Sequence, residues 1–455
     1  MSSLFATLLN STSALQVYGR AFTVIQNNIT NANTPGYVKQ DQVLVSMRFE
    51  PSAGITGGVA LGPMQTSRSV YLEQAVRDQT GLLGQAQQAL SDLGQTEPLF
   101  DVSGAAGVPG AMNNFFNGFS QLSVNPNDQV SRQNIIDAAG QVAEAFRQNA
   151  VGIQSGAGNV NNEIGDAVLT INDLAARIAG INKLYRSNLQ ASQDAGLDAQ
   201  FYSALESLSE VADFSVIKSS DGSLSVFLGG QTPLVIGDRA YPISADFTAA
   251  QTVIRDAAGK DISAQLQGRG GSLGAMLTAK NVTLPGYLAS LDGVAKAFAD
   301  SVNAALALGV DRNGAAPIVN LFTYNAALGA AYTMAITNIT PDEIAAATAA
   351  APGGNGNALA IAQLAQAPII GGFTFTQAYG NLAGRVGRDV ADARRDFNAE
   401  RDLVDQAKLR RAEVSAVSLD EEAAKLLQFQ QAYQAVGKLV GVLNSLTDSI
   451  LNILR

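Results

Sequence analysis

The chain has 455 residues, of which 47% are hydrophobic and 15% charged, so it can build packed cores, and this argues against wholesale disorder. Its formal net charge of −10, without a basic stripe, argues against nucleic acid or an anionic membrane surface as a partner. It has no cysteine and no histidine, which removes disulfides, thiol nucleophiles, imidazole bases and the usual zinc ligands.

The first predicted element is a helix that carries an apolar seam and almost no charge. Residues 1–38 contain one charged side chain, Arg20, and their apolar residues recur at heptad spacing with a polar gap at Ser11. The seam consists of Leu4, Leu8, Leu15, Tyr18, Phe22, Ile25 and Ile29. Pro35 and Gly36 end the helix.

The start of the chain lacks the basic segment of a conventional secretory signal peptide, because its first positive side chain is Arg20. No apolar run reaches the ~18 residues of a membrane span. We therefore expect no membrane insertion, and either a cytoplasmic location or export by a route that reads no such signal.

The central part of the chain is predicted to be mainly helical, with one β-rich segment. Residues 46–70 read as an extended connector with strands. Helices are predicted at 71–95, after Pro109, at 129–155, 158–187, 274–307, 357–366 and 376–411. Asp221-Gly222 is a hairpin signal inside a β-rich segment at 210–270, and further strands are possible near 331–338.

The last predicted helix, residues 419–455, carries a stronger seam than the first. The seam consists of Leu426, Phe429, Tyr433, Val436, Val440, Leu443, Thr447, Ile450 and Leu454. Ala432, Leu439, Leu446 and Ile453 widen it by a second stripe, and after Lys425 the only charges are Lys438, Asp448 and Arg455. A helix so poor in charge needs neighbours on more than one side. An ordinary bundle core and an assembly interface remain open as interpretations.

No stretch of the chain predicts catalysis. There is no phosphate-binding loop, and the calcium-like piece that begins at Asp311 lacks the downstream ligands and reads as a turn. Asp420, Glu421 and Glu422 are consecutive, so they point around a helix rather than at one another, and they suit a helix start capped by Ser418. We expect no enzyme, no cofactor and no metal.

Two terminal stretches resemble the signatures shared by flagellar rod, hook and hook-associated proteins. The first lies within residues 27–37 and contains Asn28, Asn31, Asn33, Thr34, Pro35, Gly36 and Tyr37. The second lies within residues 414–435 and contains Asp420, Glu421, Glu422, Gln430 and Tyr433. Interior stretches at 271–311 and 356–360 resemble the hook-associated protein 1 (FlgK) family. The chain departs from the family at Ala416 and Ser418, where Gly and Asn are common, and it is short for the family.

The resemblance implies a mainly α fold with a β-rich insertion, elongated and nested, in which the two terminal helices pair in a coiled-coil-like inner domain. The implied domains are 1–45 with 412–455, 46–209 with 271–411, and a small β-rich domain at 210–270. The seam residues of both terminal helices would form the assembly interface.

The resemblance also implies a function: a structural subunit of the bacterial flagellum, exported and extracellular, that forms a ring at the hook–filament junction. Its implied partners are further copies, hook protein, the second junction protein, the flagellar export apparatus, and an export chaperone on the C-terminal helix. Another flagellar axial protein, such as hook protein, a rod protein or the second junction protein, is the first alternative. A cytoplasmic helical scaffold, or an enzyme with an unusual Ser/Asp site, is the second.

Overall fold

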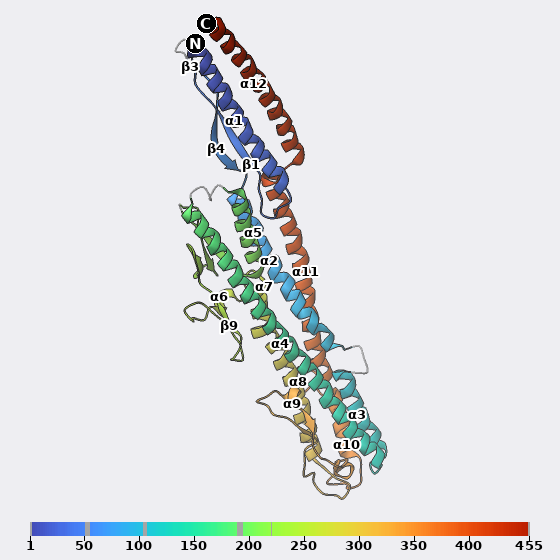
Figure 1. The fold of residues 1–455 in the computed structure, drawn as a ribbon. Coiled ribbons are helices and arrows are strands. Elements are labelled where there is room, and N and C mark those ends of the chain that lie inside the picture. The colour runs from blue at the N-terminus through green and yellow to red at the C-terminus, as the bar shows by residue number, and fades with distance from the viewer. Residues whose placement is uncertain (1, 51–54, 103–106, 189–193, 220, 454–455) are drawn as a thin grey trace. The chain divides into compact units, whose positions relative to one another are not determined.

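A computed structural model describes residues 2–50, 55–102, 107–188, 194–219 and 221–453 (Figure 1). The helices are α1 Ser2–Asn31, α2 Val70–Thr96, α3 Val108–Val124, α4 Gln129–Ser187, α5 Ala195–Val211, α6 Ser263–Leu266, α7 Ser272–Thr278, α8 Leu284–Ala307, α9 Ala330–Thr333, α10 Gly356–Gln363, α11 Phe375–Ser415 and α12 Leu419–Ile453. A π-helical turn, Ala279–Thr283, joins α7 to α8, and short 3-10 turns lie at Glu97–Phe100, Pro341–Glu343 and Leu364–Gln366.

The strands are short, and all of their pairings are antiparallel. They are β1 Gln40–Ser46, β2 Phe49–Glu50, β3 Ile55–Thr56, β4 Val59–Thr66, β5 Phe214–Lys218, β6 Leu224–Leu228, β7 Thr232–Ile236, β8 Arg239–Ala240, β9 Ser244–Asp246, β10 Val253–Arg255, β11 Gly309–Val310, β12 Phe322–Thr323, β13 Ala335–Ile336 and β14 Ala347–Thr348. Among the described residues, the largest sheet has the order β5-β6-β7-β8, and each of the others has two strands.

The chain divides into two compact units. The first consists of Met1–Gly81, Ile171–Pro242 and Arg401–Arg455, and the second of Leu82–Thr170 and Ile243–Glu400. Helices α2, α4 and α11 each contribute to both units. The first unit therefore contains both terminal helices, although their sequences lie at opposite ends of the chain.

In the first unit, α1 pairs antiparallel with α12, so that both chain ends lie at the same end of the pair (Figure 1). The β1–β4 ribbon, which pairs Gln40 with Thr66, packs along α1. A second sheet, β5-β6-β7-β8, is fastened to α4 by the buried Asn182, whose amide nitrogen donates to the carbonyls of Leu224 and Gly237 at 2.8 and 2.7 Å. A buried amide satisfied in this way fixes one arrangement of sheet and helix.

The core of the second unit is an aromatic cluster centred on Phe298 of α8. Its ring lies 5.5 Å from Phe115, 5.6 Å from Phe116, 5.5 Å from Phe322 and 5.3 Å from Phe375, centroid to centroid. All four pairs are edge-on, which is a favoured geometry for aromatic rings. The cluster brings together α3, α8, β12 and α11.

Two side chains of the stretch at 271–311 bind the loop-rich segment between α8 and α10. The carboxylate of Asp292 accepts from the amide of Ala331 at 2.8 Å and so caps the short helix α9. The side chain of Asn303 accepts from the amides of Leu321 and Phe322. The piece at Asp311 is a turn, as interpreted, because its carboxylate accepts from backbone amides two and four residues later.

The mainly α fold with strands in the middle of the chain and the pairing of the terminal helices are confirmed. The predicted break between 155 and 158 is wrong, because α4 runs unbroken through Gly156 and Gly158. The possible strands near 331–338 reduce to β13, preceded by the helical turn α9. The three-part domain division stays a prediction; the strands of 210–270 are shared between the two units.

Candidate assembly site at the paired chain ends

The two terminal helices meet along their predicted seams. The ring of Tyr18 lies 5.9 Å from that of Phe429, and the ring of Phe22 lies 6.0 Å from that of Tyr433. Ile25 and Leu443 are buried within this face, at 3% and 6% exposure. The pairing therefore shields one face of each helix and depends mainly on apolar and aromatic contact.

The remaining seam residues lie at intermediate or exposed positions. Half-buried are Leu4, Leu8, Leu15, Tyr18, Phe22, Phe429, Val436, Val440 and Ile450. Exposed to between 37% and 41% are Ile29, Leu426 and Tyr433, while Leu454 lies outside the described residues. The seam prediction missed Val17 and Ala21, which are more deeply buried than most of its members. The half-buried state of most seam residues shows that the helix pair shields them only in part.

A second apolar face of these helices is open to solvent. On α12, Leu427 is 58% exposed, Val442 57% and Leu446 48%, and on α1, Phe5 is 64% exposed and Leu9 54%. The only charged residues in the described part of α12 after Lys425 are Lys438 and Asp448. Monomeric proteins rarely leave so many large apolar side chains together on charge-poor helices, so this face has the composition of an interface.

The two signature segments meet at one buried side chain, Asn28. Its amide nitrogen donates to the carboxylate of Glu422 at 2.8 Å and to the carbonyl of Gln40 at 2.8 Å. Its amide oxygen accepts from the hydroxyl of Tyr37 at 2.8 Å and from the amide of Gln40 at 3.0 Å. Asn28 and Glu422 are both 0% exposed, so a fully satisfied polar network joins the two ends of the chain.

The charges around this network support the junction. Lys425 lies 2.7 Å from Asp41 and 3.4 Å from Glu422, and Lys39 lies 2.9 Å from Glu421. Burial raises the pKa of Tyr37 to about 12, and the negative charge of Glu422 acts in the same direction. Tyr37 therefore stays a neutral hydrogen-bond donor throughout the physiological pH range.

The rest of the N-terminal signature forms the turn that follows α1. The amide of Thr34 donates to the carbonyl of Asn31, the hydroxyl of Thr34 donates to the side chain of Asn31, and the amide of Tyr37 donates to the carbonyl of Thr34. Gly36 has φ +74°, and a Cβ there would lie 2.3 Å from the carbonyl oxygen of Ala199 on α5. Glycine is thus required both by the backbone conformation and by the close approach to α5. Asn33, Thr34 and Pro35 are exposed.

The C-terminal signature divides between the junction and solvent. Glu422 and Glu421 bond to the N-terminal segment, whereas Asp420 and Gln430 are exposed. The amide of Glu421 donates to the Ser418 hydroxyl at 3.4 Å, so the predicted cap is present. The carboxylate of Glu421, however, bonds to Lys39 rather than back to Ser418. These acids therefore join the two ends of the chain, a role that the reading of them as a local helix start did not predict.

The described residues contain no group of three or more carboxylate side chains placed to hold a metal ion. Within the same residues no helix is long and apolar enough to cross a membrane. What the arrangement offers is a pair of helices fixed at one end by a polar junction and apolar on their open faces.

Comparison with known proteins agrees with this geometry. Residues 93–322 match the family model for the helical domain of flagellar hook-associated protein FlgK, and residues 410–453 match that for the C-terminal region of flagellar basal body rod FlgEFG proteins. Flagellar hook-associated protein 1 of Bacillus subtilis is 25% identical, with 99% of each chain covered, and that of Salmonella typhimurium is 24% identical, with 100% of each covered.

A solved structure shares the fold. The flagellar hook junction protein FlgK from Burkholderia pseudomallei superimposes with a TM-score of 0.68 at 18% identity, over 75% of this chain and 100% of that one. The helical-domain match alone spans half of the sequence. The chain therefore belongs to the FlgK family of flagellar hook-associated proteins, whose members are structural components of the flagellum and not enzymes.

Proposed function

We propose that this chain is the structural subunit of the hook–filament junction, and that copies of it assemble through their terminal helices. The observation that carries the proposal is the contrast within the helix pair. One end is fastened by the buried Asn28–Glu422 network, while large apolar side chains on both helices stay open. Family membership supplies the flagellar context.

The open face offers a limited gain in free energy when subunits assemble. A fully buried Leu, Val or Phe contributes about 1.5–3 kcal/mol, so a side chain that is already half covered has roughly 1 kcal/mol left to gain. Phe5, Leu9, Leu427, Val442 and Leu446 would together contribute roughly 5 kcal/mol per subunit. Such a contribution is too small to hold two isolated copies tightly, but it adds up when each subunit has several neighbours.

The role we propose is mechanical. A ring of subunits on the hook tip would adapt a flexible hook to a stiffer filament, with hook protein and the second junction protein as neighbours. Before assembly, the open face of α12 would be covered by an export chaperone, and the chain would leave the cell through the flagellar export apparatus. The seam residues, from Leu4 to Ile29 on α1 and from Leu426 to Leu454 on α12, are proposed as the assembly interface.

The test is complementation of a strain that lacks this chain. The variant Val442→Asn with Leu446→Asn removes two open apolar side chains, and the control Gln431→Asn with Gln434→Asn introduces the same residue at exposed polar positions of α12. We expect the first variant to be exported and folded yet to leave hooks without filaments, while the control restores them. Filaments growing on the hooks of the deletion strain itself would refute the junction role.

A role as another axial protein has one observation in its favour, the match of residues 410–453 to rod proteins. The helical-domain match at 93–322 favours the junction instead. Immunogold labelling of isolated flagella separates the two: label at the hook–filament boundary supports the junction, and label at the proximal rod supports the alternative. Membership of the FlgK family excludes the second alternative, a cytoplasmic helical scaffold or an enzyme.

A further inference from the structure

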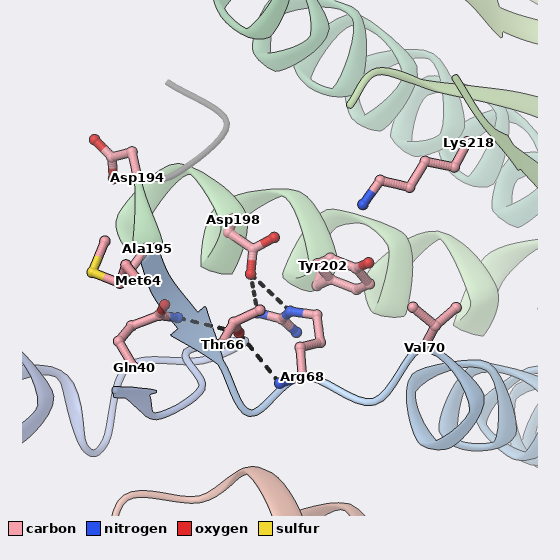
Figure 2. Close-up of a pocket in the computed structure, with 10 residues that line it drawn as sticks. All are labelled: Gln40, Met64, Thr66, Arg68, Val70, Asp194, Ala195, Asp198, Tyr202 and Lys218. Carbon is pink, nitrogen blue, oxygen red and sulfur yellow. Dashed lines mark hydrogen bonds and ion pairs between the residues drawn. The ribbon is translucent and has the colours of Figure 1, made fainter. Parts of the chain in front are cut away.

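A buried arginine outside both signature segments contacts the N-terminal one. Arg68 follows strand β4, and its side chain is 3% exposed. Its guanidinium donates to the carboxylate of Asp198 at 2.7 Å and stacks on the ring of Tyr202 at 3.8 Å (Figure 2). It also donates to the carbonyl of Gly36 at 2.7 Å. Arg68 therefore joins the turn after α1 to one face of α5.

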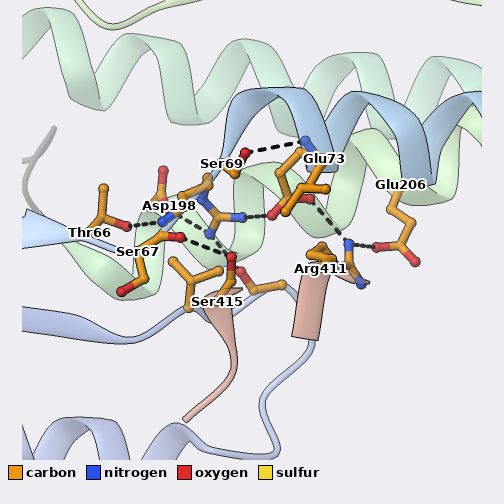
Figure 3. Close-up of polar contacts among 12 residues, drawn as sticks. Thr66, Ser67, Ser69, Glu73, Asp198, Glu206, Arg411 and Ser415 are labelled. Atoms are coloured by element: carbon orange, nitrogen blue, oxygen red, sulfur yellow. Dashed lines mark hydrogen bonds and ion pairs between the residues drawn. The ribbon is translucent and has the colours of Figure 1, made fainter. Parts of the chain in front are cut away.

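The same guanidinium is fixed from a second side. It donates to Glu73 of α2 at 2.5 Å. The other carboxylate oxygen of Glu73 accepts from Arg411 of α11 at 3.1 Å (Figure 3). Arg411 also donates to Glu206 of α5 at 2.8 Å. Burial alone would raise the pKa of Glu206, but the hydrogen bond and charge of Arg411 lower it. The charges alternate, so each ion of the cluster has a partner of opposite charge.

These contacts lie where the chain passes from the terminal helices to the rest of the first unit. Three connections cross this point: the turn after α1, the segment between β4 and α2, and the segment between α11 and α12. The last two are joined by Ser415, whose hydroxyl donates to the carbonyl of Ser67 and whose carbonyl accepts from the amide of Lys39, both at 2.9 Å. The cluster thus holds all three connections.

We propose that Arg68 is a positioning residue for assembly: by holding the Gly36 carbonyl against α5, it fixes the direction of the paired terminal helices relative to α5 within the first unit. Arg68 does this in the monomer, before any partner binds. Its importance for assembly rests on the proposed function, whereas its hold on the turn does not.

The geometry needs an arginine. One planar guanidinium meets three acceptors in different directions and stacks on an aromatic ring, which the ammonium group of lysine cannot do. Because the cluster is buried, salt screens it far less than the exposed Lys39–Glu421 pair. The hold on the turn is therefore expected to persist at 0.5 M NaCl.

The experiment compares Arg68→Lys with Arg186→Lys in the intact chain. Arg186 is a matched control, because it lies in the same unit and pairs with Asp238 at 2.7 Å while half exposed. Hydrogen exchange of the amides of residues 37–40 is measured on the monomer, and complementation of the deletion strain on whole cells. Losing two of the three hydrogen bonds predicts at least about a tenfold loss of protection.

The expected result is faster exchange and fewer filaments with Arg68→Lys, and wild-type behaviour with Arg186→Lys. Unchanged exchange in Arg68→Lys, or no protection of these amides in the wild type, overturns the proposal. Faster exchange with full complementation overturns the assembly part alone. If Arg68→Lys does not fold, Tyr202→Leu removes the stacked ring without unpairing a charge, and the same outcomes decide. Wild-type complementation reports on the proposed function separately.

Discussion

The Asn28–Glu422 contact predicts that Asn28→Asp, which replaces the side-chain amide nitrogen by an oxygen, strongly destabilises the junction between the two chain ends. In Asn28→Asp the amide nitrogen that donates to Glu422 and to the Gln40 carbonyl becomes an acceptor, while the oxygen that accepts from Tyr37 and Gln40 stays. Two buried carboxylates then face each other, because both positions are 0% exposed. Removing the partner of a buried charge costs about 3–5 kcal/mol, which is roughly a thousandfold in the opening equilibrium of the junction.

The assay is hydrogen exchange of residues 27–41 in the intact chain, at pH 7 and at about pH 4.5, corrected for intrinsic rates. Two facing carboxylates share a proton when one can bind it, so acid is expected to restore protection to Asn28→Asp. Asn33→Asp is the control, because Asn33 is exposed in the same turn. Equal protection of the two variants at pH 7 would refute the role assigned to Asn28.

Three further predictions concern Gly36, Leu443 and Asp92. Gly36→Ala places a Cβ 2.3 Å from the Ala199 carbonyl at φ +74°, so we expect a loss of at least about 2 kcal/mol in junction stability by hydrogen exchange, whereas Gly437→Ala, with open space in α12, is neutral or stabilising. Leu443→Asp is expected to abolish filament growth yet to keep the thermal transition of the second unit; loss of every transition would contradict it. Burial raises the pKa of Asp92 to about 7, so the folded protein favours the protonated carboxyl over the charged one. The contribution of Asp92 to the free energy of unfolding is therefore fully present below about pH 4 and is lost as pH rises through 7. Asp92→Asn is therefore expected to melt at a higher temperature than the wild type at pH 8, with the difference shrinking towards pH 5, and a pH-independent difference would exclude this cause.

Local pattern was enough to predict most of the secondary structure. The heptad seams predicted two charge-poor helices that need neighbours, and the family resemblance implied that they pair. Asp221-Gly222 predicted the hairpin between β5 and β6. The break predicted near residue 156 is wrong because helix propensity is a weak preference. A glycine disfavours a helix interior by about 1 kcal/mol, and the burial of Ile153 and Val160 on either side outweighs it.

The candidate site was predictable only in part. The signature segments could be found in the sequence, and the acids of the C-terminal signature could be read as a helix start. Glu422 contacts Asn28, which lies 394 residues away in the sequence. No local sequence pattern predicts such a tertiary contact. The Arg68 cluster was missed for the same reason, since Glu73 and Arg411 are 338 residues apart.

A run of charged residues in the sequence does not indicate which of its side chains form buried interactions. Most of the charged residues of α11 are exposed, as a run of charges on a helix usually is. Asp389, within that run, nevertheless accepts a 2.6 Å hydrogen bond from Tyr287, and Arg411 at the end of the helix is bound in the buried cluster. Which charges become buried depends on the helices packed against them, and these come from distant parts of the chain.

The central claim is that the terminal helices complete their burial only when subunits assemble, and hydrogen exchange of residues 2–20 and 432–453 tests it most directly. The measurement compares purified monomer with subunits incorporated at isolated hook tips. We predict rapid exchange of these residues in the monomer, against slow exchange of α3 and α8, and strong protection after incorporation. Protection in the monomer equal to that of α3 and α8, unchanged by incorporation, would show that the helix pair needs no further partner and would contradict the account.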